Sequence, residues 1–363
     1  MAKQLESDRI LFGAVVALVL FGCLMVYSAS AVLAAEQYGS SYHFLLRQVF
    51  WAILGLALML VMMNVEYPRL ASPLVVFPAL AIELVLLAAV LLVAPSHNAH
   101  RWLRWGGASF QPSELAKVVT VIFLAYFLET RRRKINDWKH TLAPVALVAG
   151  ATVALVLKEP DLGTSLAIVL IVAAMLFAAG MHLRYFAYGA LAAVPLLYIL
   201  VFHVAYRYRR ITAFLDPYAD PQGVGFQIIQ STIAVGTGGI AGVGLMDGKQ
   251  KLFFLPEPHT DFIFAVIGEE LGLVGSLAVL ALFAVILVRG LRAAMRCRSG
   301  FGRLLATGLT VMVVGQALVN ISVVVGVLPT KGIPLPMLSY GGTSLVMNLM
   351  AMGILLNISQ HSS

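Results

Sequence analysis

The chain is built from long, continuous runs of apolar residues separated by shorter polar segments. Ten such runs cover residues 10–34, 49–63, 74–94, 115–128, 142–157, 162–179, 185–204, 262–288, 304–328 and 338–357. Crossing a hydrocarbon layer of roughly 30 Å takes about 20 apolar residues in a helix. The runs do not alternate between apolar and polar positions, and an open sheet cannot satisfy its backbone in lipid. We therefore expect ten transmembrane helices and consider strands improbable.

Composition agrees with this pattern. Of the 363 residues, 60% are hydrophobic and 12% are charged, and the mean hydropathy of +0.91 excludes an ordinary soluble globular domain. The first apolar run exceeds the roughly 7 to 15 residues of a cleaved signal, so we expect a retained helix. Cys23 lies in that helix and Cys297 in a loop, so no structural disulfide is expected. No internal repeat is visible, and we predict one all-α polytopic domain over residues 1–363.

The basic residues indicate the orientation of the helices. With a cytoplasmic N-terminus, the inner segments hold Lys3, Arg9, Arg69, Arg131, Arg132, Arg133, Lys134, Lys139, Arg184, Arg289, Arg292, Arg296, Arg298 and Arg303. This distribution satisfies the positive-inside rule and accounts for most of the net charge of +8, so no nucleic-acid partner is needed. Both termini are therefore predicted to be cytoplasmic.

Two outer connections are long. One covers residues 95–111, and the other covers residues 205–261. The second is too rich in apolar and aromatic residues to be disordered. Within it, Phe226, Ile229 and Ile233 fall on one helical face, and Gln227, Gln230 and Ser231 on another, which predicts a short helix at the membrane interface.

The outer half also carries many cations, which positive-inside statistics disfavour. They are Arg47, Arg101, Arg104, Lys117, Lys158, Arg207, Arg209, Arg210, Lys249, Lys251 and Lys331. A lipid-linked diphosphate or an anionic headgroup would compensate their charge. The alternative is that they reach the interface or pair with Glu36, Glu114, Glu159, Asp216, Asp220 and Glu257. Glu114 and Lys117 are three residues apart on one helical face, and we predict a structural ion pair between them.

Asp261 is the sharpest candidate for chemistry. It precedes an apolar helix, where either Asp261 or Thr260 could act as an N-cap. Facing an outer cavity with cations, Asp261 could instead accept a proton as a general base. Glu269 and Glu270 follow more than two helical turns later, and we assign them structure or coupling. His259 has no Cys or His at ligand spacing, so no metal site is predicted, although a divalent cation (Mg or Mn) is left open. The segment "GLMDGKQK" lacks the Ser or Thr of a phosphate loop.

Five segments, in order along nearly the whole chain, resemble the FtsW/RodA (SEDS) family of bacterial cell-wall proteins: "RWLRWGGASFQPSELAK", "KEPDLGTSL", "RRITAFLDPYADPQGVGFQIIQS", "FLPEPHTDFIFAVIGEELGLVG" and "LPTKGIPLPMLSYGGTS". The segments "MVYSAS", "AVIGEELG" and "LPTKGIPLPMLSYGGTS" are more similar to the division branch, FtsW, than to the elongation branch, RodA.

The resemblance implies ten helices in the bacterial inner membrane and a peptidoglycan glycosyltransferase that polymerises lipid II on the periplasmic side. It also implies a class B penicillin-binding protein and other division proteins as partners, and an essential aspartate in "HTDF", here Asp261. On this hypothesis Asp261 deprotonates the acceptor hydroxyl, and the anomeric carbon of the undecaprenyl-diphosphate-linked glycan inverts. The candidate substrate-binding residues are Arg210, Lys251, Arg101, Lys331, Arg47, Arg209, His259, Thr260, Gln227, Ser231 and Ser339.

Three alternatives stay open: an elongation polymerase like RodA, a flippase that moves lipid II across the membrane, and a non-catalytic scaffold for the penicillin-binding protein. A flippase needs charged groups along a path through the bilayer, whereas a polymerase needs them at the outer face. The inner half offers little beyond Glu83 and the pair Glu269 and Glu270. The polymerase is therefore the preferred hypothesis.

Overall fold

The computed structural model describes residues 7–93, 101–105, 108–252 and 254–361, and is almost entirely helical. Its α-helices are α1 (Arg9–Tyr38), α2 (His43–Asn64), α3 (Pro73–Val90), α4 (Pro112–Thr130), α5 (Ala143–Lys158), α6 (Leu162–Ala178), α7 (Leu183–Phe202), α8 (Ala205–Leu215), α9 (Phe226–Gly238), α10 (Ile263–Arg296), α11 (Gly300–Val324) and α12 (Gly342–Gln360). Short helical turns are η1 (Tyr67–Ala71), η2 (Arg132–Lys134), η3 (Trp138–Leu142) and η4 (Pro217–Ala219).

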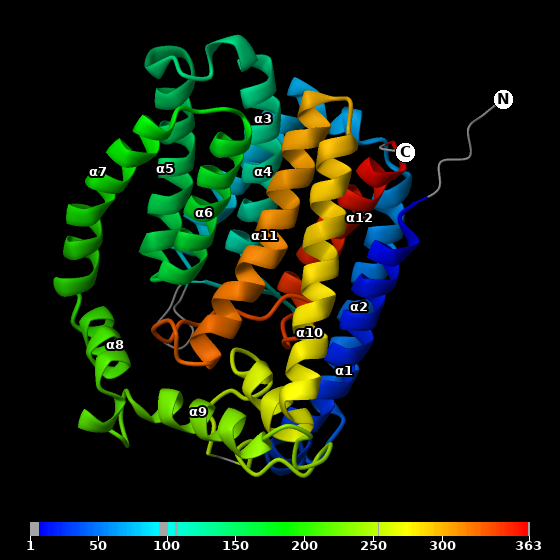
Figure 1. The fold of residues 1–363 in the computed structure, drawn as a ribbon, viewed down its shortest axis with the longest axis vertical. Helices are drawn as coiled ribbons and strands as arrows, with labels where there is room; N and C mark the ends of the chain where they lie inside the picture. The colour runs from blue at the N-terminus through cyan, green and yellow to red at the C-terminus, as the bar shows by residue number, and fades with distance from the viewer. Residues whose placement is uncertain (1–6, 94–100, 106–107, 253, 362–363) are drawn as a thin grey trace.

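The long helices run side by side, and both termini lie at the same end of the bundle (Figure 1). Within the described residues, eight helices are long and apolar enough to cross a membrane: α1, α2, α3, α5 with η3, α7, α10, α11 and α12. The apolar α6, with 17 residues, falls below that length, and α4 is outside the eight although it packs among α3, α6, α11 and α12. The multi-pass architecture agrees with the sequence, whereas the number ten stays a prediction.

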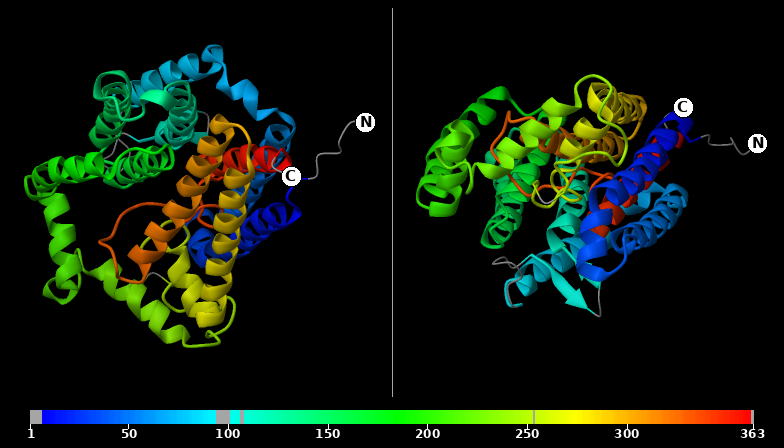
Figure 2. Two further views of the ribbon diagram at one scale, coloured as in Figure 1. Left: turned by 45° about the horizontal axis from the view of Figure 1, so that its top comes forward. Right: turned by 90° about the horizontal axis from the view of Figure 1, so that it is seen from below.

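Burial separates the central helices from the peripheral ones. In α11 and α12 most of the apolar window is buried, and polar side chains such as Gln316, Asn320 and Asn348 lie inside. Such residues avoid lipid because each polar group needs an internal partner there. The window of α7 has no buried residue, and α7 stands at the edge of the bundle (Figure 2). The core is therefore centred on α4, α11 and α12.

Helix α10 is interrupted at Gly272, whose φ of 63° and ψ of −156° are not helical. The carbonyl groups of Glu269 and Glu270, freed by this break, accept hydrogen bonds from the backbone N–H groups of Val243 and Gly244, both at 3.0 Å. A Cβ at residue 272 would lie 2.4 Å from the backbone nitrogen of Gly242. Glycine is thus required for both the conformation and the close approach.

The outer connections contain more regular structure than the sequence indicated. Residues 205–261 hold α8 in addition to α9, which occupies the stretch where a short helix was expected. The first long connection forms a small antiparallel hairpin, β1 (Leu103–Trp105) with β2 (Ala108–Phe110). The expectation that strands are improbable is wrong for this loop, because only a membrane-spanning strand faces the backbone penalty of lipid.

Candidate functional site

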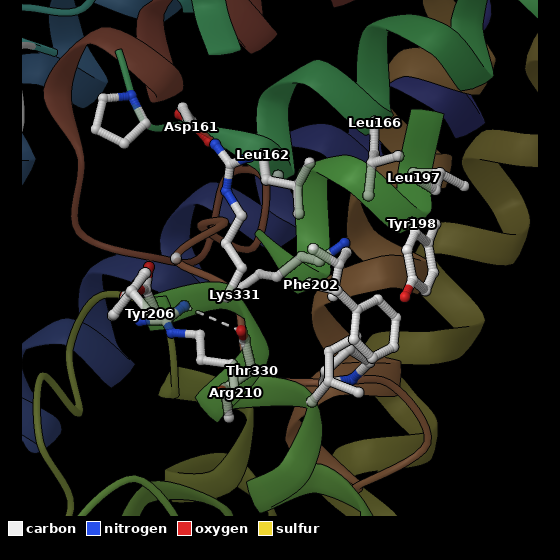
Figure 3. A pocket seen from close by; sticks show the side chains of 18 of the residues that line it. Asp161, Leu162, Leu166, Leu197, Tyr198, Phe202, Tyr206, Arg210, Thr330 and Lys331 are labelled. Atoms are coloured by element: carbon white, nitrogen blue, oxygen red, sulfur yellow. Dashed lines mark hydrogen bonds between the residues drawn. The ribbon is translucent and has the colours of Figure 1, made fainter. Parts of the chain in front are cut away.

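A cavity of about 640 Å³ is lined by residues of α6, α7 and α8 (Figure 3). Helix α8 lies at the end of the bundle opposite the termini (Figure 1). The walls of the cavity come from the start of α6, the second half of α7, α8, the segment Pro329–Gly332, and the isolated residues Arg101 and Asp261. Asp161, Arg210 and Thr330 lie toward one side of it, and Leu166, Leu197 and Tyr198 lie toward the other (Figure 3). The cavity therefore combines a polar end with an apolar wall, as expected for an amphipathic ligand.

Four cations line the polar end: Arg101, Arg207, Arg210 and Lys331. The three guanidinium groups donate to backbone carbonyl groups: Arg210 Nη1 to Thr330 O at 3.0 Å, Arg207 Nη1 to Leu200 O at 3.0 Å, and Arg101 Nε to Glu159 O at 3.1 Å. Among the described residues, none of the four cations lies within 4.0 Å of a carboxylate oxygen. The cavity thus holds positive charge that is fixed in place and available to an anion.

Asp261 lines this cavity directly before α10 and is half-buried. Its backbone carbonyl accepts a hydrogen bond from Asn320 Nδ2 at 2.8 Å, and the same amide nitrogen donates to Ile333 O at 2.7 Å. The N-cap of α10 is Phe262, without a side-chain cap, so the alternative in which Asp261 or Thr260 caps this helix is wrong. A Cβ on Gly332 would approach Asp261 Oδ2 to 3.1 Å, so the absent side chain keeps the carboxylate accessible.

The surroundings of Asp261 raise the pKa of its carboxyl group into the range that suits a general base near neutral pH. Burial, followed by the charge of Glu257, raises the pKa of Asp261 to about 7, while the positive charges of Arg210 and Arg101 oppose the rise. A carboxyl group with this pKa is partly ionised near neutral pH and can accept a proton from a hydroxyl group.

Two acidic residues behind the polar end were not predicted as site residues. Asp161 lines the cavity and caps α6, accepting from Thr164 N at 3.0 Å. Glu159 is fully buried, and neither of its carboxyl oxygens has a hydrogen-bond partner among the described residues. Burial and the charge of Asp161 raise the pKa of Glu159 to about 8, against the opposing charge of Arg101. Glu159 is thus largely neutral at pH 7 and leaves the Arg101 charge uncancelled.

The predicted substrate-binding residues separate into three groups. Arg101, Arg210 and Lys331 share the cavity with Asp261. Arg47 and Thr260 line a second cavity on the other side of residues 260 and 261. Neither cavity is lined by the remaining candidates: Lys251, Arg209, His259, Gln227, Ser231 and Ser339.

Physical reasons exclude most of the third group from ligand contact. Lys251 is buried and bound to Glu270 Oε1 at 2.6 Å, so its charge is already neutralised. Ser231 donates to Val324 O at 2.6 Å, and the hydroxyl of Ser339 accepts from Leu335 N at 2.8 Å. Arg209 is exposed and does not line the cavity, because the side chains of adjacent helical residues such as Arg209 and Arg210 point about 100° apart. Gln227 is half-buried in α9, away from both cavities.

His259 is buried between Phe44 and Tyr340, with ring centroids 4.5 and 5.5 Å away. Burial lowers the pKa of its imidazole, against the opposing charge of Glu257. We therefore assign His259 to the packing of the loop.

Signals for the missed residues were present in the sequence. Asp161 lies in "KEPDLGTSL", and Arg207 is one of the outer cations. Only the fold shows that the first turn of α6 and the face of α8 converge on Asp261. Sequence spacing within one helix cannot reveal contacts among segments that are far apart in the chain.

Glu114 and Lys117 form an ion pair, with 2.9 Å between Oε1 and Nζ, and both are almost fully buried. Lys117 Nζ also donates to Gln316 Oε1 at 2.5 Å, and Gln316 Nε2 donates to Pro334 O at 2.8 Å. The pair therefore anchors α4 to α11 and to the segment that follows the cavity residue Gly332. Among the described residues, no group of three or more His, Cys, Asp and Glu side chains converges as a metal-ligand set.

Comparison with known proteins identifies relatives along the whole chain. A family model described as "Cell cycle protein" (FTSW_RODA_SPOVE) matches residues 8–363. The "Probable peptidoglycan glycosyltransferase FtsW" of Geobacter metallireducens is 44% identical over 361 residues, which cover 98% of this chain and 96% of the relative. "Stage V sporulation protein E" of Bacillus subtilis is 40% identical over 363 residues, covering 99% of each chain.

Two solved structures share the fold. A chain from "Structural coordination of polymerization and crosslinking by a peptidoglycan synthase complex" matches with a TM-score of 0.80 and 34% identity, covering 98% of both chains. The rod shape determining protein RodA of Thermus thermophilus matches with a TM-score of 0.73 and 29% identity, covering 98% of this chain and 97% of that one. The resemblance found in the sequence motifs is confirmed, and the chain belongs to the FtsW/RodA/SpoVE family of cell cycle proteins.

Proposed function

We propose that this protein is a peptidoglycan glycosyltransferase of cell division that polymerises lipid II, with Asp261 as its general base. The observation that carries the proposal is the cavity, which brings Asp261 together with four cations and opens onto an apolar wall. The curated relatives named as probable FtsW glycosyltransferases, 43–44% identical, support the same reaction. Three FtsW-like segments of the sequence, "MVYSAS", "AVIGEELG" and "LPTKGIPLPMLSYGGTS", favour the division branch over elongation.

The donor is a glycan strand on undecaprenyl diphosphate, and the acceptor is the 4-hydroxyl of the GlcNAc of another lipid II. Asp261 takes the hydroxyl proton as the oxygen bonds to C1 of the donor MurNAc. The C1–O bond to the diphosphate breaks at the same carbon, which inverts from α to β, and undecaprenyl diphosphate leaves with the bonding electrons. No second carboxylic acid is needed, because diphosphate is already a good leaving group.

Each part of the cavity serves one step of this reaction. Arg101, Arg207, Arg210 and Lys331 meet the charge that develops on the departing diphosphate, and their backbone hydrogen bonds hold three of them in advance. The apolar residues of α6 and α7, including Leu166 and Leu197, accept the start of the prenyl chain. A divalent ion would have to draw ligands from the phosphates themselves, since the described residues hold no group of three or more His, Cys, Asp and Glu side chains that could bind it.

We place the protein in the bacterial inner membrane with the cavity on the periplasmic side. The basic residues of the predicted inner segments support this orientation, because they include η2 and the end of α10, at the same end of the bundle as the termini. With α4 and α6 also crossing the bilayer, the helices number ten. A class B penicillin-binding protein is the proposed partner, supported by the synthase complex that shares this fold.

Polymerisation of labelled lipid II by the purified protein with this partner tests the proposal. We expect Asp261→Ala and Asp261→Asn to abolish glycan synthesis while leaving the protein folded. Glycan synthesis by well-folded Asp261→Asn would remove the general-base role. Movement of lipid II across vesicles by the wild type, without polymer, would instead support the flippase, and a dispensable Asp261 in dividing cells would support the scaffold.

A further inference from the structure

Three segments that the mechanism above does not use meet at one buried ion pair. They are "MVYSAS" in α1, "GLMDGKQK" between α9 and α10, and "AVIGEELG" in the first part of α10. Each segment supplies one residue: Ser28, Lys251 and Glu270, whose exposed fractions are 2%, 6% and 0%. We call these three residues the anchor, because they join parts of the chain that are far apart in sequence.

The hydrogen bonds of the anchor are complete. Lys251 Nζ donates to Glu270 Oε1 at 2.6 Å, to Met246 O at 2.8 Å and to Ser28 Oγ at 3.0 Å. An ammonium group has three hydrogens, so none is left for a ligand. The hydroxyl of Ser28 donates to the Glu270 carboxylate, 2.7 Å from each of its oxygens, and Glu270 Oε2 also accepts from Met246 N at 3.1 Å. The anchor therefore holds segments of the protein together and leaves no group free for a substrate.

The anchor lies directly before the break in α10, which makes residues 263–271 a separate short helix. After the break, the backbone N–H groups of Leu273 and Val274 donate to Gly239 O and Ile240 O, at 3.0 and 3.2 Å. These two N–H groups thus bind the segment that follows α9, where an unbroken helix would bind its own previous turn. The orientation of residues 263–271 consequently depends on that segment and on the anchor.

The neighbouring carboxylate holds the same segment just before Lys251. Glu269 Oε1 accepts from Lys249 N at 2.8 Å and from Gln250 N at 3.1 Å. A Cβ on Gly248 would lie 2.9 Å from Glu269 Oε2, so the backbone of the segment packs closely on this carboxylate. The position of Lys251 is therefore fixed by its neighbours in the chain before it binds Glu270.

The short helix connects the anchor to Asp261, which lies two residues before its start. Residues 263–270 are all buried, and they extend over about 12 Å at about 1.5 Å per residue. Asn320 Nδ2 binds Asp261 O at 2.8 Å at the front of this helix, and the anchor binds its rear. Closely packed elements transmit displacements, so a shift at the rear changes the position of the carboxylate at the front.

We propose that Ser28, Lys251 and Glu270 are positioning residues for Asp261. They fix the first part of α10 in the orientation that brings the carboxylate to the reacting hydroxyl group, and they do not touch the substrate. A displacement of about 1 Å between reacting groups can cost about a hundredfold in rate, so hydrogen bonds at the rear of the helix affect kcat. The inference rests on the proposed glycosyltransferase function and adds to it three residues that line neither cavity.

Initial rates of lipid II polymerisation, with the full-length chain and its penicillin-binding partner in nanodiscs, test the proposal. We expect Lys251→Met to lower kcat about tenfold or more and to change the KM for lipid II less than about twofold. The pH at which activity rises should stay near 7, because the groups that shift the pKa of Asp261 are unchanged.

Two double variants separate positioning from stability. Lys251→Met with Glu270→Met replaces the ion pair by apolar side chains, so the melting temperature should recover. Its kcat should stay low, because the acceptor for Ser28 and Met246 is lost. Lys251→Met with Glu270→Gln keeps a neutral acceptor at this point and should recover most of kcat. If the ion pair only stabilised the fold, kcat would follow the melting temperature in both double variants.

A matched control comes from the other end of the same two helices. Arg289 Nε pairs with Asp8 Oδ2 and so also joins α10 to the start of α1, but on the far side of the break from Asp261. Asp8→Asn removes the charge and keeps a side chain that can cap α1. We expect this variant to change kcat and KM less than about twofold.

Equal losses of kcat in Asp8→Asn and Lys251→Met, or full recovery of kcat in the Met–Met double variant, would overturn the proposal. A raised KM with unchanged kcat in Lys251→Met would also overturn it, because Lys251 would then bind substrate.

If the variants of the ion pair fail to fold, Ser28→Ala decides, since it removes one hydroxyl group and keeps the charges. Its kcat should fall about fivefold, the rate equivalent of about one hydrogen bond, and an unchanged kcat would refute the role of the anchor. Absence of polymer with the wild type would count against the glycosyltransferase proposal itself, which separates the two failures.

Discussion

Replacing Arg210 by Gln removes a positive charge near Asp261 while keeping a side-chain amide. That charge opposes the rise of the Asp261 pKa to about 7. A positive charge near a carboxylate lowers the pKa of that carboxylate by about 1 to 3. We attribute the lower end, about 1, to Arg210, because Arg101 also lowers the pKa of Asp261. The pKa of Asp261 in Arg210→Gln should therefore rise to about 8.

The consequence is a shift in the pH dependence of catalysis. A general base works in its ionised form, so activity increases as pH rises through the pKa. At pH 7 the ionised fraction of Asp261 falls from about one half to about one tenth, a loss of about fivefold in kcat from the base alone. This loss should disappear by about pH 9, whereas any loss of diphosphate binding remains as a higher donor KM.

Initial rates of lipid II polymerisation from pH 5.5 to 9.5 provide the assay. Arg210→Lys is the matched control, because it keeps the positive charge. In this variant the rise of activity with pH should stay centred near pH 7. If activity rises at the same pH in wild type and in Arg210→Gln, the electrostatic coupling between Arg210 and Asp261 is refuted. If a variant of Asp261 with residual activity still shows the same rise of rate with pH, a group other than Asp261 is titrating.

Three further predictions concern stability, each measured by thermal unfolding in detergent. Lys117→Met leaves Glu114 buried without a cation and should destabilise the protein by about 3–5 kcal/mol. Adding Glu114→Gln to this variant should recover part of the lost stability. If the double variant instead loses the sum of the two single losses in stability, the ion pair is contradicted. Gly272→Ala should lower the stability by about 1–3 kcal/mol because of its backbone conformation alone. The control Gly13→Ala, with open space around its Cβ, should leave the stability unchanged or slightly higher. Equal changes in stability for the two variants would contradict the argument that the break in α10 requires glycine. A carboxyl group whose pKa is raised on folding loses its stabilising contribution as pH rises from about 4, the unfolded pKa, through about 7, the folded pKa. Asp261→Asn should therefore be more stable than wild type at pH 9, by at most about 4 kcal/mol, and equally stable at pH 3. A lower melting temperature for Asp261→Asn than for wild type at pH 9 would contradict the raised pKa.

The sequence predicted the membrane helices because lipid imposes one strong constraint on any spanning segment. A continuous apolar run identifies such a helix without knowledge of its neighbours, and eight of the expected spans correspond to helices that meet this criterion. The break at Gly272 and the pairing of strands β1 and β2 were missed, because both depend on backbone contacts with other segments.

For the site, the sequence by itself determined the family and pointed to Asp261 as the candidate base, since both rest on contiguous segments such as "HTDF". It also identified a surplus of outer cations, but their partners were decided by the tertiary structure. Lys251 and Arg210 have the same charge in the same loop, yet one is neutralised by Glu270 and the other faces Asp261. Charge is a property of the residue, whereas its availability to a ligand depends on which carboxylate the fold places beside it.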